Sequence, residues 1–179
     1  HALPVSYAIK ERFPEAHLTW VVEKPAYPIL EDNPYIDDII LFEKAKFRSV
    51  SGFLHEIGPF RRRLRARRYN ASLDLQGLFK SAAIVWNAGA RQRVGTANMR
   101  EGAHLVSRPV RGAHAEGHIV ERYLDVARAL GCTVDEVRFP VAVSERDRAA
   151  AEALLVREGV QEGRMFVAFA IGANWPNKR

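Results

Sequence analysis

The stretch DLQGLFKSA, residues 74–82, places polar and basic side chains at the point where a strand passes into a helix. The residues before it are typical of a strand, and Gln76 and Lys80 stand at the start of a helix predicted over 78–88. In open parallel sheets, ligands bind beyond the carboxyl ends of the strands. The free N–H groups at the helix start could receive an anion, and Lys80 would add positive charge. An anion site and a plain turn beside a solvated lysine are both consistent with these residues.

Other basic residues stand near the same predicted edge. Lys44, Lys46 and Arg48 follow a strand predicted over 37–42, so they are placed to meet an anionic substrate. The largest charge cluster is a run of six arginines, which is either the solvated face of a long helix or a patch for an anionic acceptor or membrane surface; it consists of Arg61, Arg62, Arg63, Arg65, Arg67 and Arg68.

Two irregular segments also carry candidate ligand-binding residues. NMREGAHLV, residues 98–106, holds Arg100, for which a binding and a structural role are equally consistent with the sequence. GANWPNKR, residues 172–179, follows an apolar strand and contains Asn174 and Lys178. Either a phosphate-binding loop or a linker explains its composition. His118 and Arg122 share a helix face, but a second ligand at metal-binding spacing is missing, so we expect no metal site there.

The composition limits the class of protein. The chain has 179 residues, a net charge of +6 and a pI of about 9.8, which favours anionic partners. The single cysteine, Cys132, excludes an internal disulfide. No apolar run approaches the roughly 18 residues of a membrane span. Nucleic-acid binding is not expected, because zinc-finger spacing, an aromatic RNA-binding signature and a helix-turn-helix pattern are all missing.

Strand and helix patterns alternate along the chain. Strands are predicted over 17–22, 37–42, 69–75, 92–96 and 165–171, and helices over 3–13, 25–34, 47–68, 78–88, 115–130 and 145–158. This order predicts an α/β fold, a doubly wound and mostly parallel sheet with helices on both faces. Gly131 and Ser144 are expected to end and begin helices, and Gly58-Pro59 to kink or split the long one. The only domain boundary expected is at the C-terminal end.

Several segments, taken in order, resemble the family-9 glycosyltransferases, the ADP-heptose:lipopolysaccharide heptosyltransferases. The matching pieces span nearly the whole chain; they are HALPVSYAIKERFPEAHLTWVVE, NPYIDDII, DLQGLFKSA, RVGTANMREGA, HIVERYLDVARALG and GANWPNKR. The resemblance implies a GT-B enzyme, with two Rossmann-like domains facing across a cleft. Residues 1–179 would be the N-terminal, acceptor-side domain, truncated at both ends, and the donor-binding domain would lie beyond it.

The resemblance also implies a reaction. Heptose would pass from ADP-heptose to the Kdo/heptose inner core of lipopolysaccharide, with inversion and without a metal or other cofactor. The general base would be an aspartate just upstream of His1, so we expect no catalytic residue in this chain and no activity from the fragment alone. Lys178 and Asn174 would contact the donor, although Asn174 replaces a hydroxyl or small polar residue of the family. Gln76, Lys80 and Arg100 would line the acceptor side, and Lys44, Lys46 and Arg48 would face the acidic acceptor groups.

The expected location is the cytoplasm, with peripheral contact at the inner face of the inner membrane, where a Kdo-lipid A acceptor would lie. Three alternatives remain open at this point. The protein could transfer another sugar to another acceptor, or it could be a non-catalytic Rossmann-like module that binds an anion or nucleotide. The arginine run leaves a nucleic-acid module as the last alternative.

Overall fold

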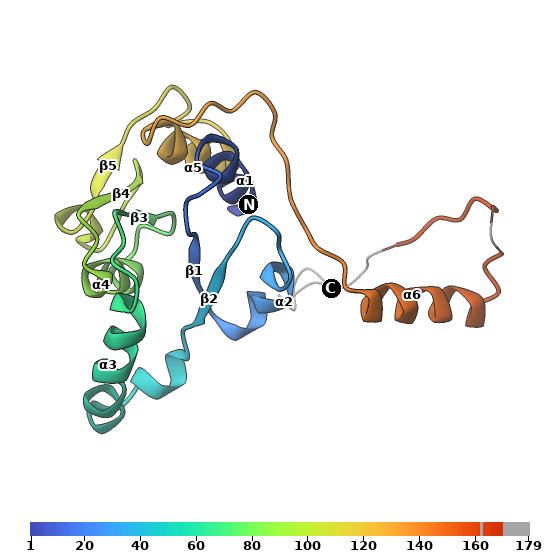
Figure 1. The fold of residues 1–179 in the computed structure, drawn as a ribbon, viewed down its shortest axis with the longest axis horizontal. Helices are drawn as coiled ribbons and strands as arrows, with labels where there is room; N and C mark the ends of the chain where they lie inside the picture. The colour runs from blue at the N-terminus through green and yellow to red at the C-terminus, as the bar shows by residue number, and fades with distance from the viewer. Residues whose placement is uncertain (162, 170–179) are drawn as a thin grey trace. The chain divides into compact units, whose positions relative to one another are not determined.

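Short parallel strands alternate with helices in the computed structural model of the protein, which describes residues 1–161 and 163–169 (Figure 1). The helices are α1 (Leu3–Arg12), α2 (Tyr27–Leu30), α3 (Val50–Arg65), α4 (Phe79–Ala88), α5 (Ile119–Arg128) and α6 (Glu145–Arg157), with 3-10 turns η1 (Lys24–Ala26), η2 (Lys44–Phe47) and η3 (Ala103–Leu105). The strands are β1 (Thr19–Val22), β2 (Asp38–Leu41), β3 (Ala71–Asp74), β4 (Gln92–Thr96) and β5 (Arg108–Val110).

The chain divides into two compact units, His1–Ala142 and Val143–Arg179. The first unit contains every strand of the described residues. In the second, Ser144 begins α6 as expected, because its hydroxyl accepts a hydrogen bond from the Asp147 N–H at 3.1 Å. The two units meet in sequence between Ala142 and Val143.

The strands of the first unit form two parallel sheets. β1 pairs with β2 in the register Trp20↔Ile39, and β4 lies between β3 and β5 with Leu73↔Val94. β1 and β3 do not pair with each other in the described structure, so the single sheet that was expected is present as two pieces.

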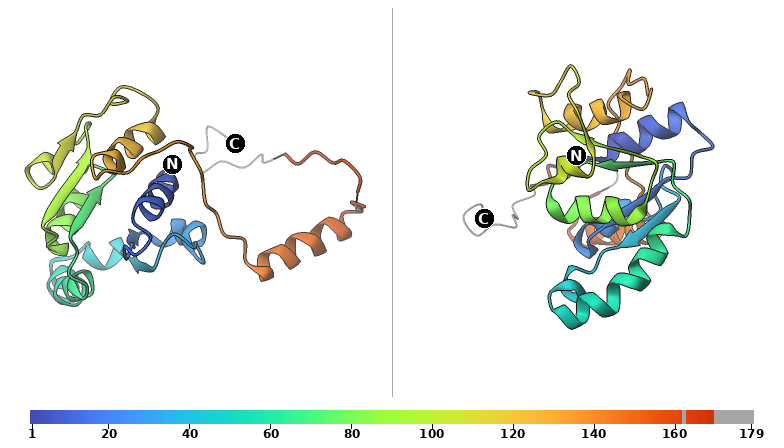
Figure 2. Two further views of the ribbon diagram at one scale, coloured as in Figure 1. Left: turned by 45° about the horizontal axis from the view of Figure 1, so that its top comes forward. Right: turned by 90° about the vertical axis from the view of Figure 1, so that its left-hand side faces the viewer.

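Helices cover both faces of these sheets. On one face, α1 and α5 pack together through residues such as Val5, Ile9 and Leu124. On the other face, α3 and α4 cover Ile40 with Phe60 and Leu64. The right-hand view of Figure 2 shows this layering, with α1 and α5 on one side of the strands and α4 on the other. The predicted Rossmann-like α/β class is confirmed.

Three sequence predictions need adjustment. The long helix predicted over 47–68 is shorter in the structure, where α3 covers Val50–Arg65 and continues through Pro59. β5, whose three residues include Pro109, follows the irregular segment 98–106 and was not among the predicted strands. The apolar strand predicted over 165–171 is wrong for 165–169, which form no strand. The second unit offers these residues no partner strand among its described residues, and a lone strand leaves its backbone unpaired.

Candidate functional site

The turn after β3 is built around a buried carboxylate. Asp74 is only 2% exposed, and one of its carboxylate oxygens accepts a hydrogen bond from the Gly77 N–H at 2.7 Å. Gly77 has φ +66°, and a Cβ on it would lie 3.0 Å from Met99 Cγ. Both facts favour glycine, because L-residues rarely adopt this backbone and Met99 leaves no room. The turn therefore sets the direction of the chain between β3 and α4, the segment in which Gln76 and Lys80 lie.

The loop after β4 is tied to this turn and to α4. The Arg100 N–H donates to the Gly77 carbonyl at 2.8 Å. The Phe79 N–H, at the first position of α4, donates to the Glu101 carboxylate at 3.1 Å. Glu101 itself has φ +54°, a strained backbone for a residue other than glycine. The chain therefore supplies its own anion at this helix start, where the sequence suggested that a substrate anion could bind.

Lys80 lies at the carboxyl edge, between elements of both sheets. Its ammonium group forms an ion pair with the carboxylate of Glu23, the first residue after β1. The same ammonium lies 5.9 Å from the ring centroid of Phe42, the first residue after β2. The side chains of Lys80 and Glu23 remain 32% and 42% exposed, so an anion in solution can reach them. The prediction that Lys80 lies at the ligand-binding edge is consistent with this geometry, and Glu23 is a neighbour that the sequence did not single out.

The other predicted acceptor residues are exposed in the same unit. Gln76 is exposed at the second position after β3, and the side chain of Arg100 is exposed on the loop held against the turn. The hydrogen bond between the Arg100 N–H and the Gly77 carbonyl thus holds the backbone of Arg100 beside the turn that carries Gln76. Their binding roles stay predictions.

Lys44, Lys46 and Arg48 lie in and after η2, on the α3 side of the unit. Lys46 pairs with Glu43 at 2.8 Å, and this hydrogen bond raises the pKa of Lys46. Phe47 of the same turn stacks on Phe42, with ring centroids 5.1 Å apart. Phe42 therefore connects this basic segment to Lys80.

The arginine run is partly structural. Arg65 donates to the Asn87 carbonyl at 2.9 Å, which ties α3 to the end of α4. Arg67 pairs with Asp38 at 3.0 Å at the amino end of β2. The hydrogen bonds from His17 and Arg67 lower the pKa of Asp38. Two of the six arginines thus act within the fold.

A second polar cluster, which the sequence did not indicate, joins α5 to the loop after β5. Asp125 of α5 is 3% exposed and accepts hydrogen bonds from the His114 N–H at 2.9 Å and from the Arg128 guanidinium at 2.9 Å. Burial acts to raise the pKa of Asp125, but the hydrogen bonds outweigh it and the pKa is lowered. Gly112 leaves room for this carboxylate, since a Cβ there would lie 2.3 Å from Asp125 Cγ. The cluster anchors the loop before α5.

The remaining candidates divide between the described and undescribed parts. Asn174 and Lys178 lie outside the described residues. Cys132 is buried, which raises the pKa of its thiol, as expected of a packing residue. In residues 1–161 and 163–169, no group of three or more His, Cys, Asp or Glu side chains is arranged to hold a metal ion. No helix in the described part of the chain combines the length and hydrophobicity that a membrane crossing requires.

Comparison with curated proteins finds a lipopolysaccharide core heptosyltransferase. OpsX of Haemophilus influenzae is 25% identical over 155 residues, which cover 85% of this chain and 42% of OpsX. The chain thus spans less than half the length of this relative.

Solved structures of similar fold include three glycosyltransferases. A family-9 glycosyltransferase from Veillonella parvula matches with a TM-score of 0.80 and 19% identity, over 99% of this chain and 51% of that one. The heptosyltransferase WaaC of E. coli, solved with ADP-2-deoxy-2-fluoro heptose, matches with a TM-score of 0.65 and 26% identity, over 78% of this chain and 46% of WaaC. ADP-heptose lps heptosyltransferase II of E. coli matches with a TM-score of 0.62 and 22% identity, over 91% of this chain and 47% of that enzyme. These matches confirm the fold expected of the N-terminal half of a GT-B glycosyltransferase.

The family model for glycosyltransferase family 9 (heptosyltransferase) matches residues 57–179, more than two thirds of the chain. This range includes the turn after β3, α4 and the loop that carries Arg100 and Glu101. The chain therefore belongs to glycosyltransferase family 9.

Proposed function

We propose that the protein containing this chain transfers a heptose from ADP-heptose to the Kdo/heptose inner core of lipopolysaccharide. The observation that carries the proposal is the family match over residues 57–179. The names of OpsX and of the two E. coli heptosyltransferases support the same activity. The chain itself would be the acceptor-side domain, with the donor domain beyond it.

The proposed reaction is an inverting transfer without a metal. The acceptor hydroxyl oxygen attacks the anomeric carbon, the bond from that carbon to the diphosphate breaks, and ADP leaves. A carboxylate outside this chain takes the hydroxyl proton as general base. Basic side chains would stabilise the departing diphosphate, a role that we assign to Lys178, and we assign Asn174 to donor binding as well.

The basic carboxyl edge fits an acidic acceptor. Gln76 and Lys80 lie on the segment between β3 and α4, and a backbone hydrogen bond joins the loop of Arg100 to the same turn, so we assign the three residues to one acceptor sugar. Kdo carries a carboxylate, which accepts hydrogen bonds from ammonium and guanidinium groups. Lys44, Lys46 and Arg48 would extend the positive surface toward further acidic groups of the acceptor.

A membrane-bound acceptor also calls for a docking surface, and the region around η2 and the start of α3 has the required chemistry. Val50 and Leu54 of α3 are 79% and 69% exposed, although both are large and apolar. Exposed Lys44 and Arg48 precede them in sequence. Arg61 comes seven residues after Leu54 and lies on the same face of α3. Apolar insertion next to basic residues is how peripheral helices bind anionic lipid surfaces. We therefore place the membrane contact here.

The test is a transfer assay on the full-length protein with ADP-heptose and Kdo-lipid A, read by mass spectrometry. A gain of one heptose is the expected result. Transfer of another sugar, or to another acceptor, would keep the glycosyltransferase and overturn the substrate assignment. No transfer from any nucleotide sugar by the folded protein, with retained nucleotide binding, would favour a non-catalytic module instead.

A further inference from the structure

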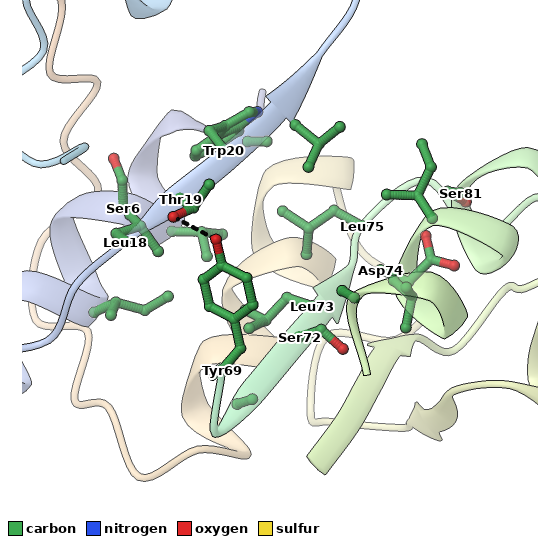
Figure 3. Close-up of a pocket in the computed structure, with 18 of the residues that line it drawn as sticks. Ser6, Leu18, Thr19, Trp20, Tyr69, Ser72, Leu73, Asp74, Leu75 and Ser81 are labelled. Atoms are coloured by element: carbon green, nitrogen blue, oxygen red, sulfur yellow. Dashed lines mark hydrogen bonds between the residues drawn. The ribbon is translucent and has the colours of Figure 1, made fainter. Parts of the chain in front are cut away.

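The inner side of α4 faces the rest of the fold. Ser81, Ile84 and Val85 line a pocket, and Asp74 at the end of β3 lines the same pocket (Figure 3). Ile84 also packs against the apolar cluster that includes Leu64 of α3. These positions of α4 are three and four residues apart, so they mark one side of the helix.

The outer side of α4 carries apolar residues instead of the charged residues expected there. Phe79 and Trp86 are seven residues apart, so they lie on the same side of the helix, and they are 69% and 58% exposed. Ala83 lies between them on this side. These three residues, the α4 stripe, have the i, i+4, i+7 spacing by which one helix packs against another.

The polar side chains of α4 bond within the fold. Lys80 forms its ion pair with the residue after β1. The Ser81 hydroxyl donates to the Leu78 carbonyl at 2.8 Å, and the Asn87 amide donates to the Ala83 carbonyl at 2.8 Å. A surface helix normally turns a charged or polar side toward water, and a helix that is apolar on both sides is typically covered on both. The sequence of α4 therefore indicates that something covers the α4 stripe.

Arginine side chains and one more apolar side chain flank the stripe. The guanidinium carbon of Arg93 lies 5.0 Å from the ring centroid of Trp86, a cation–π contact that restrains the ring. Arg91, two residues earlier, is exposed. Leu105 is also exposed, on η3, which packs against α4. An apolar centre beside arginine is the composition of the residues that contribute most to protein–protein binding.

The charge of this part of the chain indicates what kind of partner fits. Residues 81–106 contain Arg91, Arg93 and Arg100, no lysine, and Glu101 as their only acid. The Glu101 carboxylate already accepts a hydrogen bond from the Phe79 N–H. Protein interfaces are enriched in arginine and depleted in lysine, whereas membrane surfaces attract both, so the composition favours an acidic protein. A second copy of this face would bring arginines against arginines, which opposes self-association.

We propose that the α4 stripe binds an acidic amphipathic helix of a partner protein. The apolar side of that helix would pack along Phe79 and Trp86, and the small Ala83 between them would let the two helices approach closely. Carboxylates beside the apolar side would pair with Arg91 and Arg93, since guanidinium groups bind carboxylates through two hydrogen bonds. This inference does not depend on which donor or acceptor the protein uses.

The first measurement asks whether the stripe is free in the full-length protein without its partner. Trp86→Cys should react with a maleimide as fast as Glu116→Cys, at an exposed loop position, and buried Cys132 should add little background. Slow labelling at every protein concentration would show that another segment of the same chain covers the stripe. Slow labelling only at high protein concentration would show that a second copy covers it. Either result would overturn the proposal.

Two synthetic helical peptides of about twenty residues, long enough to form isolated helices, test the chemistry of the partner. Both carry the same stripe of leucines, which is flanked by glutamates in one peptide and by lysines in the other. The full-length protein should bind the glutamate peptide about tenfold more tightly than the lysine peptide. Arg91→Glu with Arg93→Glu should reverse this preference. Equal affinities in the wild type, or binding of neither peptide at about 1 mM, would contradict the proposal.

Trp86→Asp tests whether the peptide binds at the stripe. The substitution should weaken binding of the glutamate peptide about tenfold or more, because a tryptophan in the centre of an interface contributes strongly to binding. Ile29→Asp, at an exposed apolar position of α2, is the matched control and should leave binding unchanged. Equal losses in the two variants would place the binding elsewhere. Co-sedimentation with anionic vesicles that requires Trp86, without a preference between the peptides, would assign the stripe to a membrane and overturn the proposal.

Discussion

The ammonium group of Lys80 pairs with the carboxylate of Glu23, and the two residues follow strands that belong to different sheets. Because both side chains are about a third or more exposed, an ion pair of this kind contributes only about 0–1 kcal/mol to stability. The pair therefore matters more for the position of the Lys80 ammonium than for folding.

Lys80→Ala should weaken the use of the acceptor more than that of the donor. Loss of one charge-assisted hydrogen bond, about 1.5–3 kcal/mol, corresponds to a rise of roughly tenfold or more in the acceptor KM. Arg100→Ala should act in the same direction, since the loop hydrogen bond to Gly77 involves the Arg100 backbone and survives the substitution. Steady-state kinetics of the full-length protein with each substrate varied in turn provide the measurement. Unchanged acceptor kinetics in both variants would remove these residues from the acceptor site.

Glu23→Gln tests whether Glu23 positions Lys80. The substitution keeps the shape of the side chain but removes its charge, so the acceptor KM should rise a few-fold in the wild-type background. In the Lys80→Ala background, Glu23→Gln should have no further effect, because the group that it positions is gone. Equal effects in both backgrounds would mean that Glu23 acts independently of Lys80. Glu116→Gln, on an exposed loop, serves as the control.

Glu101→Ala should destabilise the protein by about 1 kcal/mol, because the carboxylate accepts a hydrogen bond from the first N–H of α4. Glu101→Gln keeps an acceptor oxygen and should therefore lose less stability than Glu101→Ala. Urea unfolding of the full-length protein, followed by circular dichroism, measures both changes. A Glu101→Ala variant as stable as the wild type would show that water replaces the carboxylate at this helix start.

Sequence reasoning succeeded where the signal is local. Ser144 begins α6 and Gly131 ends α5 with φ +89°, since each cap depends on the chemistry of one residue. The apolar and polar periodicities likewise located the helices and most of the strands, which is sufficient for the α/β class. They also placed Gln76 and Lys80 at the carboxyl edge, because strand ends in parallel sheets share an edge.

The features that sequence reasoning missed depend on contacts between distant residues. Glu101 reaches α4 only because its backbone adopts φ +54° and the loop after β4 lies against the turn. Glu23 meets Lys80 across 57 residues of sequence. β5 is three residues long and contains Pro109, so its pattern is too short to detect. In each case the residues that form the contact or the strand pair are too far apart in sequence to be detected from the local pattern of apolar and polar residues.

The carboxylate of Asp125 should make the stability of the folded protein depend on pH. Hydrogen bonds from His114 and Arg128 outweigh the effect of burial and lower the pKa of Asp125. A folded pKa below the unfolded value of about 3.9 stabilises the folded state above that pH, and the contribution is lost as the pH falls through the folded pKa. Asp125→Asn should therefore lower Tm at pH 7 and flatten its fall below about pH 4. Asp135→Asn, at an exposed position, is the control. The same dependence of Tm on pH in the two variants would contradict the prediction.

The exposed apolar residues of α3 should decide binding to anionic membranes. Val50 and Leu54 are exposed apolar residues, and the exposed basic residues Lys44 and Arg48 precede them in sequence. An exposed apolar patch of this kind is typical of an interaction surface. Leu54→Asp should reduce co-sedimentation of the full-length protein with vesicles containing anionic phospholipid by about tenfold, since it removes an inserting side chain and adds repulsion. Leu105→Asp, at a position 81% exposed on η3, makes the same chemical change elsewhere and should leave binding unchanged. Binding of the wild type should also weaken when the salt concentration is raised or when zwitterionic phospholipid replaces the anionic phospholipid in the vesicles. Equal losses in the two variants, or wild-type binding that ignores vesicle charge, would place the membrane contact on another surface.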